Sequence, residues 1–236
     1  MKTDYMPLTV AESFYHNYQP IFNLRTWNKT GYEVLFRSKI HATPVKAFQI
    51  AKKEKNLFKL DIESIKLALH NLSTFQHIHK GAKLFINVYP STILHPDFNF
   101  FFKEHIHPCV QKDSLVFELN ESEELDHPGP LVKKLDSLKS SGLKIAIDDF
   151  GAGRSDMMNL LELNPDYIKV DRYITSELDT SPKKQEFLQY LVNYSRRFNI
   201  KLILEGIETS KELTVAKMLG VTYAQGFLLG KPQKLM

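Results

Sequence analysis

Polar side chains that could do chemistry stand at or near the ends of most short apolar runs in this 236-residue chain. They are Asn87, Glu118, Asp148 with Asp149, Lys169, Glu205 and Gln225, and Glu33 lies inside the first such run. Any one of them could merely end its strand in solvent. Loops more often place Gly, Pro, Ser or Asn there, so the repetition over six runs favours convergence on one site.

Five of these residues are acids, namely Glu33, Glu118, Asp148, Asp149 and Glu205. Carboxylates gathered in one cleft repel each other, which raises several of their pKa values, and cations would relieve the repulsion. With the amide of Asn87 and no histidine or cysteine at the strand ends, the ligands favour Mg²⁺ or Mn²⁺ over zinc. Five acids exceed what one Mg²⁺ usually takes, so we expect two ions, the arrangement suited to in-line displacement at phosphorus. Lys169 fits as a fixed positive charge beside the attacking water.

The elements that must position these residues alternate between strands and helices. The apolar runs predict strands at 31–37, 83–88, 114–119, 143–148, 167–170, 201–206 and 222–227. Apolar residues at helical spacing predict helices at 57–73, 129–142, 183–199 and 210–220, with Gly142 and Gly220 as helix C-terminal glycines. This alternation predicts an α/β fold with a parallel sheet. We expect a (β/α) barrel, in which the strand C-terminal ends meet on one face, with a doubly wound open sheet as the alternative.

Composition narrows the class of protein further. The formal charge of +4 is mild and the basic residues are spread along the chain, so no nucleic acid polymer is expected as a partner. No apolar run approaches the roughly 18 residues of a membrane span, and the N-terminus lacks the features of a signal peptide. Cys109 is the only cysteine, which fits a cytoplasmic protein. Without a linker or a repeat, we expect one domain over residues 1–236.

The glycines after the paired aspartates suggest a second interpretation. "FGAG" (150–153) follows a predicted strand, as the first turn of a dinucleotide-binding fold does. The G-x-G-x-x-G spacing fails at Asp156, and two acids before the glycines would repel a pyrophosphate. This interpretation is therefore disfavoured.

Several short motifs, taken together in order, carry a family resemblance. They are "YQPI" (18–21), "EVL" (33–35) followed by Arg37, "INVYP" (86–90), "ELNE" (118–121), "DDFGAG" (148–153), "KVD" (169–171), "EGIE" (205–208) and "QGFLLGKP" (225–232). With them the chain resembles the EAL-domain family, the bacterial phosphodiesterases of cyclic di-GMP, over nearly its whole length. The resemblance implies a single EAL phosphodiesterase domain with a modified TIM (β/α)8 barrel whose first strand is antiparallel. We expect that reversed strand to explain why Glu33 lies within its run.

The resemblance also implies roles for individual residues. Glu33, Asn87, Glu118 and Asp148 would hold one metal ion, and Asp148, Asp149 and Glu205 the second. Lys169 would contact the nucleophilic water, so that Lys169, Glu33 and Glu205 are the expected catalytic residues. Arg37 would meet the substrate phosphate. The residues that would shape the substrate site are Gln19, Asp171, Glu208, Gln225 and Pro232. Glu121 would brace the loop after Asp149 through Ser155.

The implied reaction is Mg²⁺- or Mn²⁺-dependent opening of cyclic di-GMP to linear pGpG by a homodimer. Departures from the family pattern include Val34, Asn120 and Phe227, and Arg154 and Asp156 in the loop that couples dimerisation to metal binding in the family. The usual companion domains, a sensor or a GGDEF domain, are expected to be absent, so regulation would come from elsewhere. Two alternatives stay open: a non-catalytic cyclic di-GMP receptor or protein-binding module, and a different metal-dependent barrel enzyme. Family members without catalysis usually lack a metal ligand, and this chain lacks none.

Overall fold

Eight strands close into a barrel in which each strand pairs with the next along the chain and the last pairs with the first. The computed structural model describes residues 13–71, 81–110, 114–119, 123, 128–152 and 156–234. The strands are β1 (Phe14–Asn23), β2 (Lys29–Ser38), β3 (Lys83–Val88), β4 (Leu115–Leu119), β5 (Lys144–Phe150), β6 (Tyr167–Val170), β7 (Lys201–Leu204) and β8 (Tyr223–Ala224). The expected barrel is confirmed, and the open sheet is wrong.

Strand β1 runs against both of its neighbours, β2 and β8, whereas all pairs from β2 to β8 are parallel. The modified barrel with an antiparallel first strand is thus confirmed. The explanation offered for Glu33 is wrong, however, because Glu33 belongs to β2, which is parallel to β3. Glu33 lies within its strand because β2 continues to Ser38, beyond the level of the acid cluster.

No strand was predicted over β1, and its sequence explains why. The segment FYHNYQPIFN carries His16, Asn17 and Gln19 among its apolar residues and has Pro20 near its middle. A proline cannot donate a ladder hydrogen bond and usually argues against a strand. Here Pro20 faces Tyr32 in the antiparallel pair with β2, so the long hairpin carries the strand past it.

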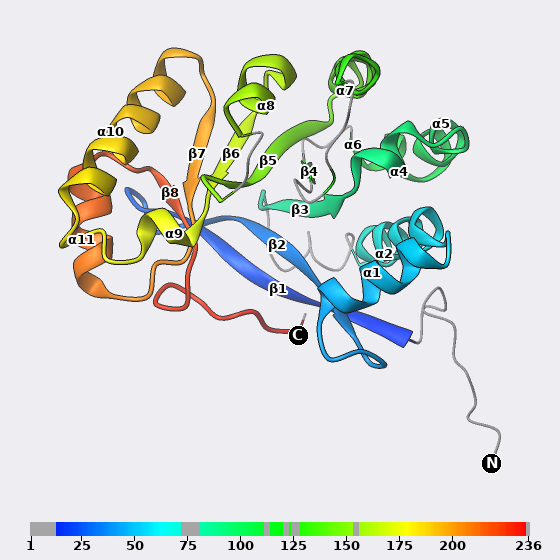
Figure 1. Ribbon diagram of the computed structural model, residues 1–236, viewed down its shortest axis with the longest axis horizontal. Helices are drawn as coiled ribbons and strands as arrows, with labels where there is room; N and C mark the ends of the chain where they lie inside the picture. The colour runs from blue at the N-terminus through cyan, green and yellow to red at the C-terminus, as the bar shows by residue number, and fades with distance from the viewer. Residues whose placement is uncertain are drawn as a thin grey trace.

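Helices surround the strands on the outside (Figure 1). They are α1 (Pro44–Lys53), α2 (Leu57–His70), α4 (Pro90–Leu94), α5 (Phe98–Phe101), the π-helix η2 (Phe102–Ile106), α6 (His107–Val110), α7 (Gly129–Ser140), α8 (Asp156–Leu163), α9 (Arg172–Thr175), α10 (Pro182–Arg197) and α11 (Ser210–Met218). The four predicted helices correspond to α2, α7, α10 and α11. Gly142 and Gly220 follow α7 and α11 with positive φ angles of 94° and 84°, as helix C-terminal glycines do.

The barrel interior is apolar at one end and acidic at the other. A separate core cluster fills the end where the parallel strands begin: Ile21, Phe85, Val116, Ala146, Tyr167 and Ile203. Two larger apolar clusters lie between the strands and the surrounding helices. The polar site therefore lies at the C-terminal ends of the strands, as in TIM barrels generally.

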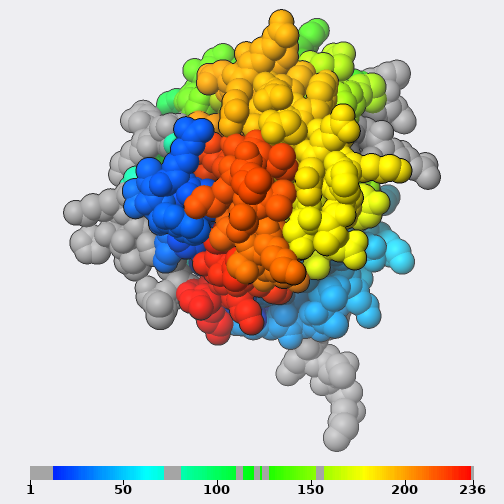
Figure 2. All heavy atoms as spheres, turned by 90° about the vertical axis from the view of Figure 1, so that its left-hand side faces the viewer, coloured from blue at the N-terminus to red at the C-terminus, as the bar shows by residue number. Residues whose placement is uncertain are grey.

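The two ends of the chain close the barrel together. Phe22 and Asn23 of β1 pair with Ala224 and Tyr223 of β8. Figure 2 shows the dark blue N-terminal hairpin beside the orange and red C-terminal segments. At the hairpin, the Lys217 ammonium lies 5.0 Å from the centre of the Trp27 ring. Long-range pairing thus fixes β1 in a closed sheet without an edge.

Among the described residues, no helix combines the length and the apolar composition that a bilayer crossing requires.

The segments that follow β7 and β8 approach each other closely at Gly226. A Cβ atom at Gly226 would lie inside van der Waals contact with the backbone nitrogen and oxygen of Ile207. We expect Gly226→Ala to lower the free energy of unfolding by about 1–3 kcal/mol or more, measured by urea denaturation. In the matched control, Gly129→Ala at the start of α7 meets nothing within 4 Å and should change stability by less than about 1 kcal/mol. Equal losses in both variants would contradict this close approach.

Candidate active site

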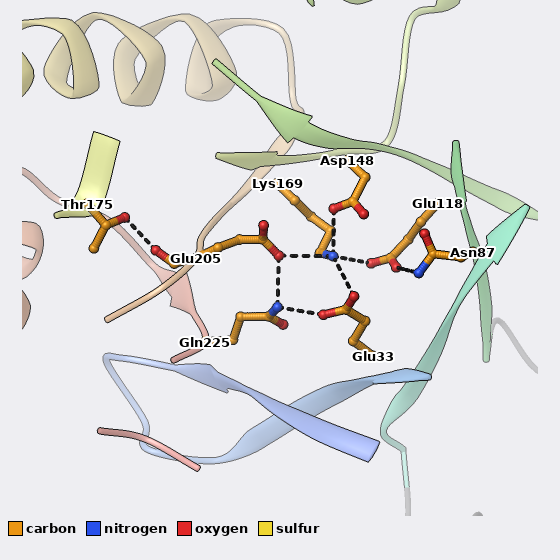
Figure 3. A network of polar contacts seen from close by, with 8 residues as sticks. All are labelled: Glu33, Asn87, Glu118, Asp148, Lys169, Thr175, Glu205 and Gln225. Atoms are coloured by element: carbon orange, nitrogen blue, oxygen red, sulfur yellow. Dashed lines mark hydrogen bonds and ion pairs between the residues drawn. The ribbon is translucent and has the colours of Figure 1, made fainter. Parts of the chain in front are cut away.

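Five strands or their C-terminal ends bring acids and one lysine together (Figure 3). Glu33 comes from β2, Glu118 from β4, Asp148 from β5 and Lys169 from β6, while Glu205 directly follows β7. Each strand places its polar side chain on the inner face because side chains alternate along a strand. In β6, Lys169 points inward while Ile168 and Val170 pack outward against the helices.

Lys169 lies at the centre of the acid cluster and is completely buried. Its Nζ lies 2.7 Å from Asp148 Oδ1, 2.8 Å from Glu118 Oε1, 3.0 Å from Glu205 Oε1 and 3.4 Å from Glu33 Oε1. An ammonium carries three hydrogens, so it cannot donate to all four carboxylates at once. One positive charge also cannot neutralise four negative ones, so the cluster keeps a strong demand for further cations.

The pKa values reflect this imbalance. Burial raises the pKa of Glu118 well above its ordinary range, against the opposing charge of Lys169. Burial likewise raises the pKa of Glu205. Burial, followed by the charge of Asp148, raises the pKa of Asp149 to about 6. Burial alone would lower the pKa of Lys169, but the carboxylates around it together hold that pKa well above its usual value.

Two amide side chains fix the orientation of the carboxylates. Gln225, which follows β8, donates from Nε2 to Glu33 Oε2 over 2.7 Å and to Glu205 Oε1 over 2.8 Å. Asn87 donates from Nδ2 to Glu118 Oε2 over 3.1 Å, which leaves its amide oxygen as an acceptor. Gln225 thus links the two sides of the cluster, between β2 and β7.

Asp148 and Asp149 both contribute because β5 is irregular at this point. Ile147 pairs with Ile168 and Phe150 with Val170, so three residue steps on β5 face two on β6. Asp149 occupies this bulge with a φ of 52°, a left-handed conformation that is uncommon for residues other than glycine. The bulge turns the second carboxylate toward the first instead of away from it.

The carboxylates form two groups that share Asp148. One oxygen from each of Glu33, Glu118 and Asp148 lies within 4.8 Å of the others, and the same holds for Asp148, Asp149 and Glu205. Hard oxygen donors in two adjoining groups fit two divalent cations of the Mg²⁺ or Mn²⁺ type. The two oxygens of the buried Glu118 face different partners: Oε1 lies 2.8 Å from the Lys169 ammonium, and Oε2 accepts from Asn87.

Two of the residues expected to contact substrate, Gln19 and Arg37, belong to the β1–β2 hairpin. Gln19 is buried, faces Glu33 across the β1–β2 pair and donates to the Gly230 carbonyl. Arg37 is half-buried and donates to the carbonyl of Phe36 over 2.8 Å.

The remaining expected residues lie on the segments around the mouth of the barrel. Asp171 caps α9 through Tyr173 N, and Glu208 pairs with Arg172 at 3.2 Å. Pro232 lies half-buried beside Gln233, which bridges to Tyr18 of β1. Glu121 and Ser155 lie outside the described residues.

Two supporting residues were missed in the sequence. Thr175 of α9 donates its hydroxyl to the backbone carbonyl of Glu205 and so holds the acid's segment in place. Glu212 of α11 is buried and accepts from the backbone N–H groups of Glu177, Glu208 and Thr209. The T-x-x-E pattern at 209–212, a capping box, could have identified Glu212. No local pattern marks Thr175.

Fold and site together define a β/α barrel protein with a metal-competent acidic centre at the C-terminal ends of its strands. Residues 8–232 match the EAL domain family, and the chain belongs to that family.

Curated relatives cover nearly all of the chain. The probable cyclic di-GMP phosphodiesterase PdeG of Escherichia coli K12 is 28% identical over 228 residues, which cover 91% of this chain and 44% of the relative. The cyclic di-GMP phosphodiesterase TpdA of Vibrio parahaemolyticus is 26% identical over 227 residues, which cover 93% of this chain and 37% of the relative. The chain thus spans less than half the length of these relatives.

Solved structures share the fold. Klebsiella pneumoniae BlrP1, in a calcium and cyclic di-GMP complex, is similar with a TM-score of 0.83 at 27% identity, covering 97% of this chain and 58% of that one. The EAL enzyme Bd1971, with cAMP and cyclic di-GMP bound, has a TM-score of 0.83 at 25% identity, covering 94% of this chain and 63% of that one.

The pKa of Asp149 gives a pH-dependent prediction for metal-free protein in EDTA. Because that pKa rises from 3.8 to about 6 on folding, the folded state binds the proton more tightly than the unfolded chain. Asp149 therefore destabilises the fold progressively as pH rises from about 4 to about 6. Asp149→Asn cannot titrate, so its melting temperature relative to wild type should climb across that window and level off above it. A difference that is constant with pH would contradict the raised pKa.

Proposed function

We propose that this chain hydrolyses one phosphodiester bond of cyclic di-GMP to give linear pGpG, with two Mg²⁺ or Mn²⁺ ions. The observation that carries the proposal is the pair of carboxylate groups that share Asp148 around the buried Lys169. Support also comes from relatives named as cyclic di-GMP phosphodiesterases. BlrP1, at 26–27% identity, has been solved with cyclic di-GMP and either manganese or calcium.

In this proposal the two carboxylate groups hold the ions. Glu33, Asn87, Glu118 and Asp148 would hold one, and Asp148, Asp149 and Glu205 would hold the other. Bound there, the ions would neutralise the phosphate and lower the pKa of a water molecule. Gln225 holds Glu33 and Glu205 at a fixed separation through its amide nitrogen. The ligands are thereby oriented before substrate arrives, which limits reorganisation during the reaction.

Lys169 has two roles in the proposed reaction, one before the cations bind and one after. Without cations its ammonium forms ion pairs with four carboxylates and offsets part of their mutual repulsion. With cations bound to the carboxylates, the Lys169 ammonium would be free to orient the attacking water. The water oxygen bonds to phosphorus, the bond from phosphorus to the 3′ oxygen breaks, and that oxygen leaves with a proton. The second water proton passes to solvent.

The substrate is placed by the residues around the mouth of the barrel. In this proposal Arg37 contacts a substrate phosphate once substrate displaces its hydrogen bond to the Phe36 carbonyl. The other substrate-site residues are Gln19, Asp171, Glu208, Gln225 and Pro232. Asp171 caps α9. The ion pair between Glu208 and Arg172 joins the segment after β7 to α9. We also propose that the reaction takes place in the cytoplasm.

Apolar side chains on α8 support a homodimer. The side chains of Met157, Met158 and Leu161, all on α8, are 45%, 54% and 63% exposed. Neighbouring exposed apolar side chains of this size commonly mark a protein–protein contact. We expect Leu161→Glu to shift the chain from dimer to monomer in light scattering, because a charge would be buried at the interface. An unchanged mass would contradict a dimer contact through α8.

The reaction is tested by incubating pure protein with cyclic di-GMP and Mg²⁺ or Mn²⁺ and separating products by chromatography. The proposal predicts linear pGpG, and none in EDTA. No product at micromolar enzyme would refute it. Tight cyclic di-GMP binding without turnover would instead support a non-catalytic receptor. Equal hydrolysis of unrelated phosphodiesters would indicate a different barrel enzyme.

Glu33→Gln isolates the role of one carboxylate. The change keeps side-chain shape but removes a negative ligand that contacts both Lys169 and Gln225. We expect turnover to fall by at least about a hundredfold. Even the loss of a group that only hydrogen-bonds to a metal ligand lowers metal affinity or activity by about 10–100-fold. The matched control is Glu63→Gln on α2, which breaks only a surface pair with Lys66 and should keep wild-type turnover. Wild-type activity in Glu33→Gln would remove this residue from the metal assignment.

A further inference from the structure

Asp61 is a buried acid that lies outside the acid cluster. It belongs to α2 and is only 2% exposed. Burial raises the pKa of Asp61 to about 7, although a hydrogen bond from the Tyr89 backbone opposes the shift. A carboxyl group whose pKa is raised on folding costs stability as pH rises from about 4 to about 7. A role elsewhere in the molecule would explain why an acid is kept at this position.

Asp61 contacts the turn that follows β3. Its Oδ2 accepts from the backbone N–H of Tyr89 over 2.9 Å. Tyr89 is the N-cap residue of α4, and its carbonyl accepts from the backbone N–H groups of Thr92 and Ile93. The helices α2 and α4 lie side by side (Figure 1). Asp61 therefore fixes the point at which the chain leaves β3 and begins α4.

A second acid holds the same turn. Glu123, on the segment after β4, accepts from the backbone N–H of Ser91 over 2.7 Å and pairs with Lys52 of α1 at 3.3 Å. Pro90 has no N–H, so Asp61 and Glu123 satisfy the amides on either side of it. Side chains from α2 and from the segment after β4 thus hold the turn together.

This turn directly follows a residue of the proposed metal site. Asn87 lies two residues before Tyr89, near the C-terminal end of β3, and faces Glu118 of β4. The 3.1 Å hydrogen bond from Asn87 Nδ2 to Glu118 Oε2 joins the two side chains (Figure 3). Both belong to the group proposed to hold one cation. Because metal ligands must be held to within about 0.5 Å, the position of the turn affects how well this group binds a cation.

We infer that Asp61 is a positioning residue for this cation. It contacts neither the cation nor the substrate. By fixing the backbone of Tyr89, it keeps Asn87 beside Glu118, where the two side chains can bind the same ion. The inference rests on the metal site of the proposed function but not on the hydrolysis itself.

Mn²⁺ binding to the full-length protein tests this role without turnover. Free Mn²⁺ is followed by electron paramagnetic resonance during titration of wild type, Asp61→Ala and Asp61→Asn. We expect Asp61→Ala to raise the Kd of at least one Mn²⁺ ion by about tenfold or more, because the Tyr89 N–H loses its acceptor. Asp61→Asn keeps an oxygen that can accept from Tyr89, so its Kd should stay within about threefold of wild type.

A core variant separates positioning from a general loss of stability. Leu188→Ala on α10 removes a fully buried side chain from a different apolar cluster, so it should lower Tm and leave the Mn²⁺ Kd unchanged. All titrations are made well below the lowest Tm. In EDTA, amide hydrogen exchange over residues 86–93 should be faster in Asp61→Ala than in wild type or Asp61→Asn.

The outcomes distinguish this inference from the proposed function. A wild-type Kd in Asp61→Ala, or an equal rise in Leu188→Ala, would overturn the positioning role and leave the proposed reaction intact. Unchanged exchange over residues 86–93 in Asp61→Ala would do the same. If wild type itself bound no Mn²⁺, the metal assignment of the proposed function would fail, and the positioning role with it.

Discussion

Four carboxylates converge on one buried ammonium, and a fifth carboxylate lies beside them. The ion pairs of Lys169, from 2.7 to 3.4 Å, lie in a setting where water cannot screen the charges. One ammonium leaves most of the negative charge uncompensated, and the raised pKa values of Glu118, Glu205 and Asp149 follow from this burial and repulsion. An acidic centre of this kind can be relieved by protons or by metal ions. The proposed chemistry uses the second route.

The fold sustains this centre by keeping the remainder of the barrel interior apolar. The interior cluster around Phe85 and Ile203 fills the level beneath the acids, so the polar side chains are confined to the C-terminal ends of the strands. Closure through the reversed strand β1 brings Gln19 opposite Glu33, and closure through β8 brings Gln225 between Glu33 and Glu205. The two ends of the sequence therefore complete a site whose ligands come mainly from its middle.

Most of the fold could be predicted from the sequence, since hydrophobic runs gave β3 and β6 with the observed bounds. Strand β1 could not, because Pro20 and its polar neighbours conceal a strand that only long-range pairing stabilises. The order of polar residues predicted which side chains meet. It could not predict how Asp149 turns toward Asp148, because the bulge depends on pairing between β5 and β6.

The most direct test of the central claim is the number of Mn²⁺ ions that one chain binds. Electron paramagnetic resonance of free Mn²⁺ during a titration, with cyclic di-GMP replaced by a non-hydrolysable analogue, gives this number without any turnover. The two carboxylate groups that share Asp148 predict two Mn²⁺ ions per chain. Fewer than two bound Mn²⁺ ions per chain at saturation, or the same stoichiometry after Asp148→Asn, would contradict the account.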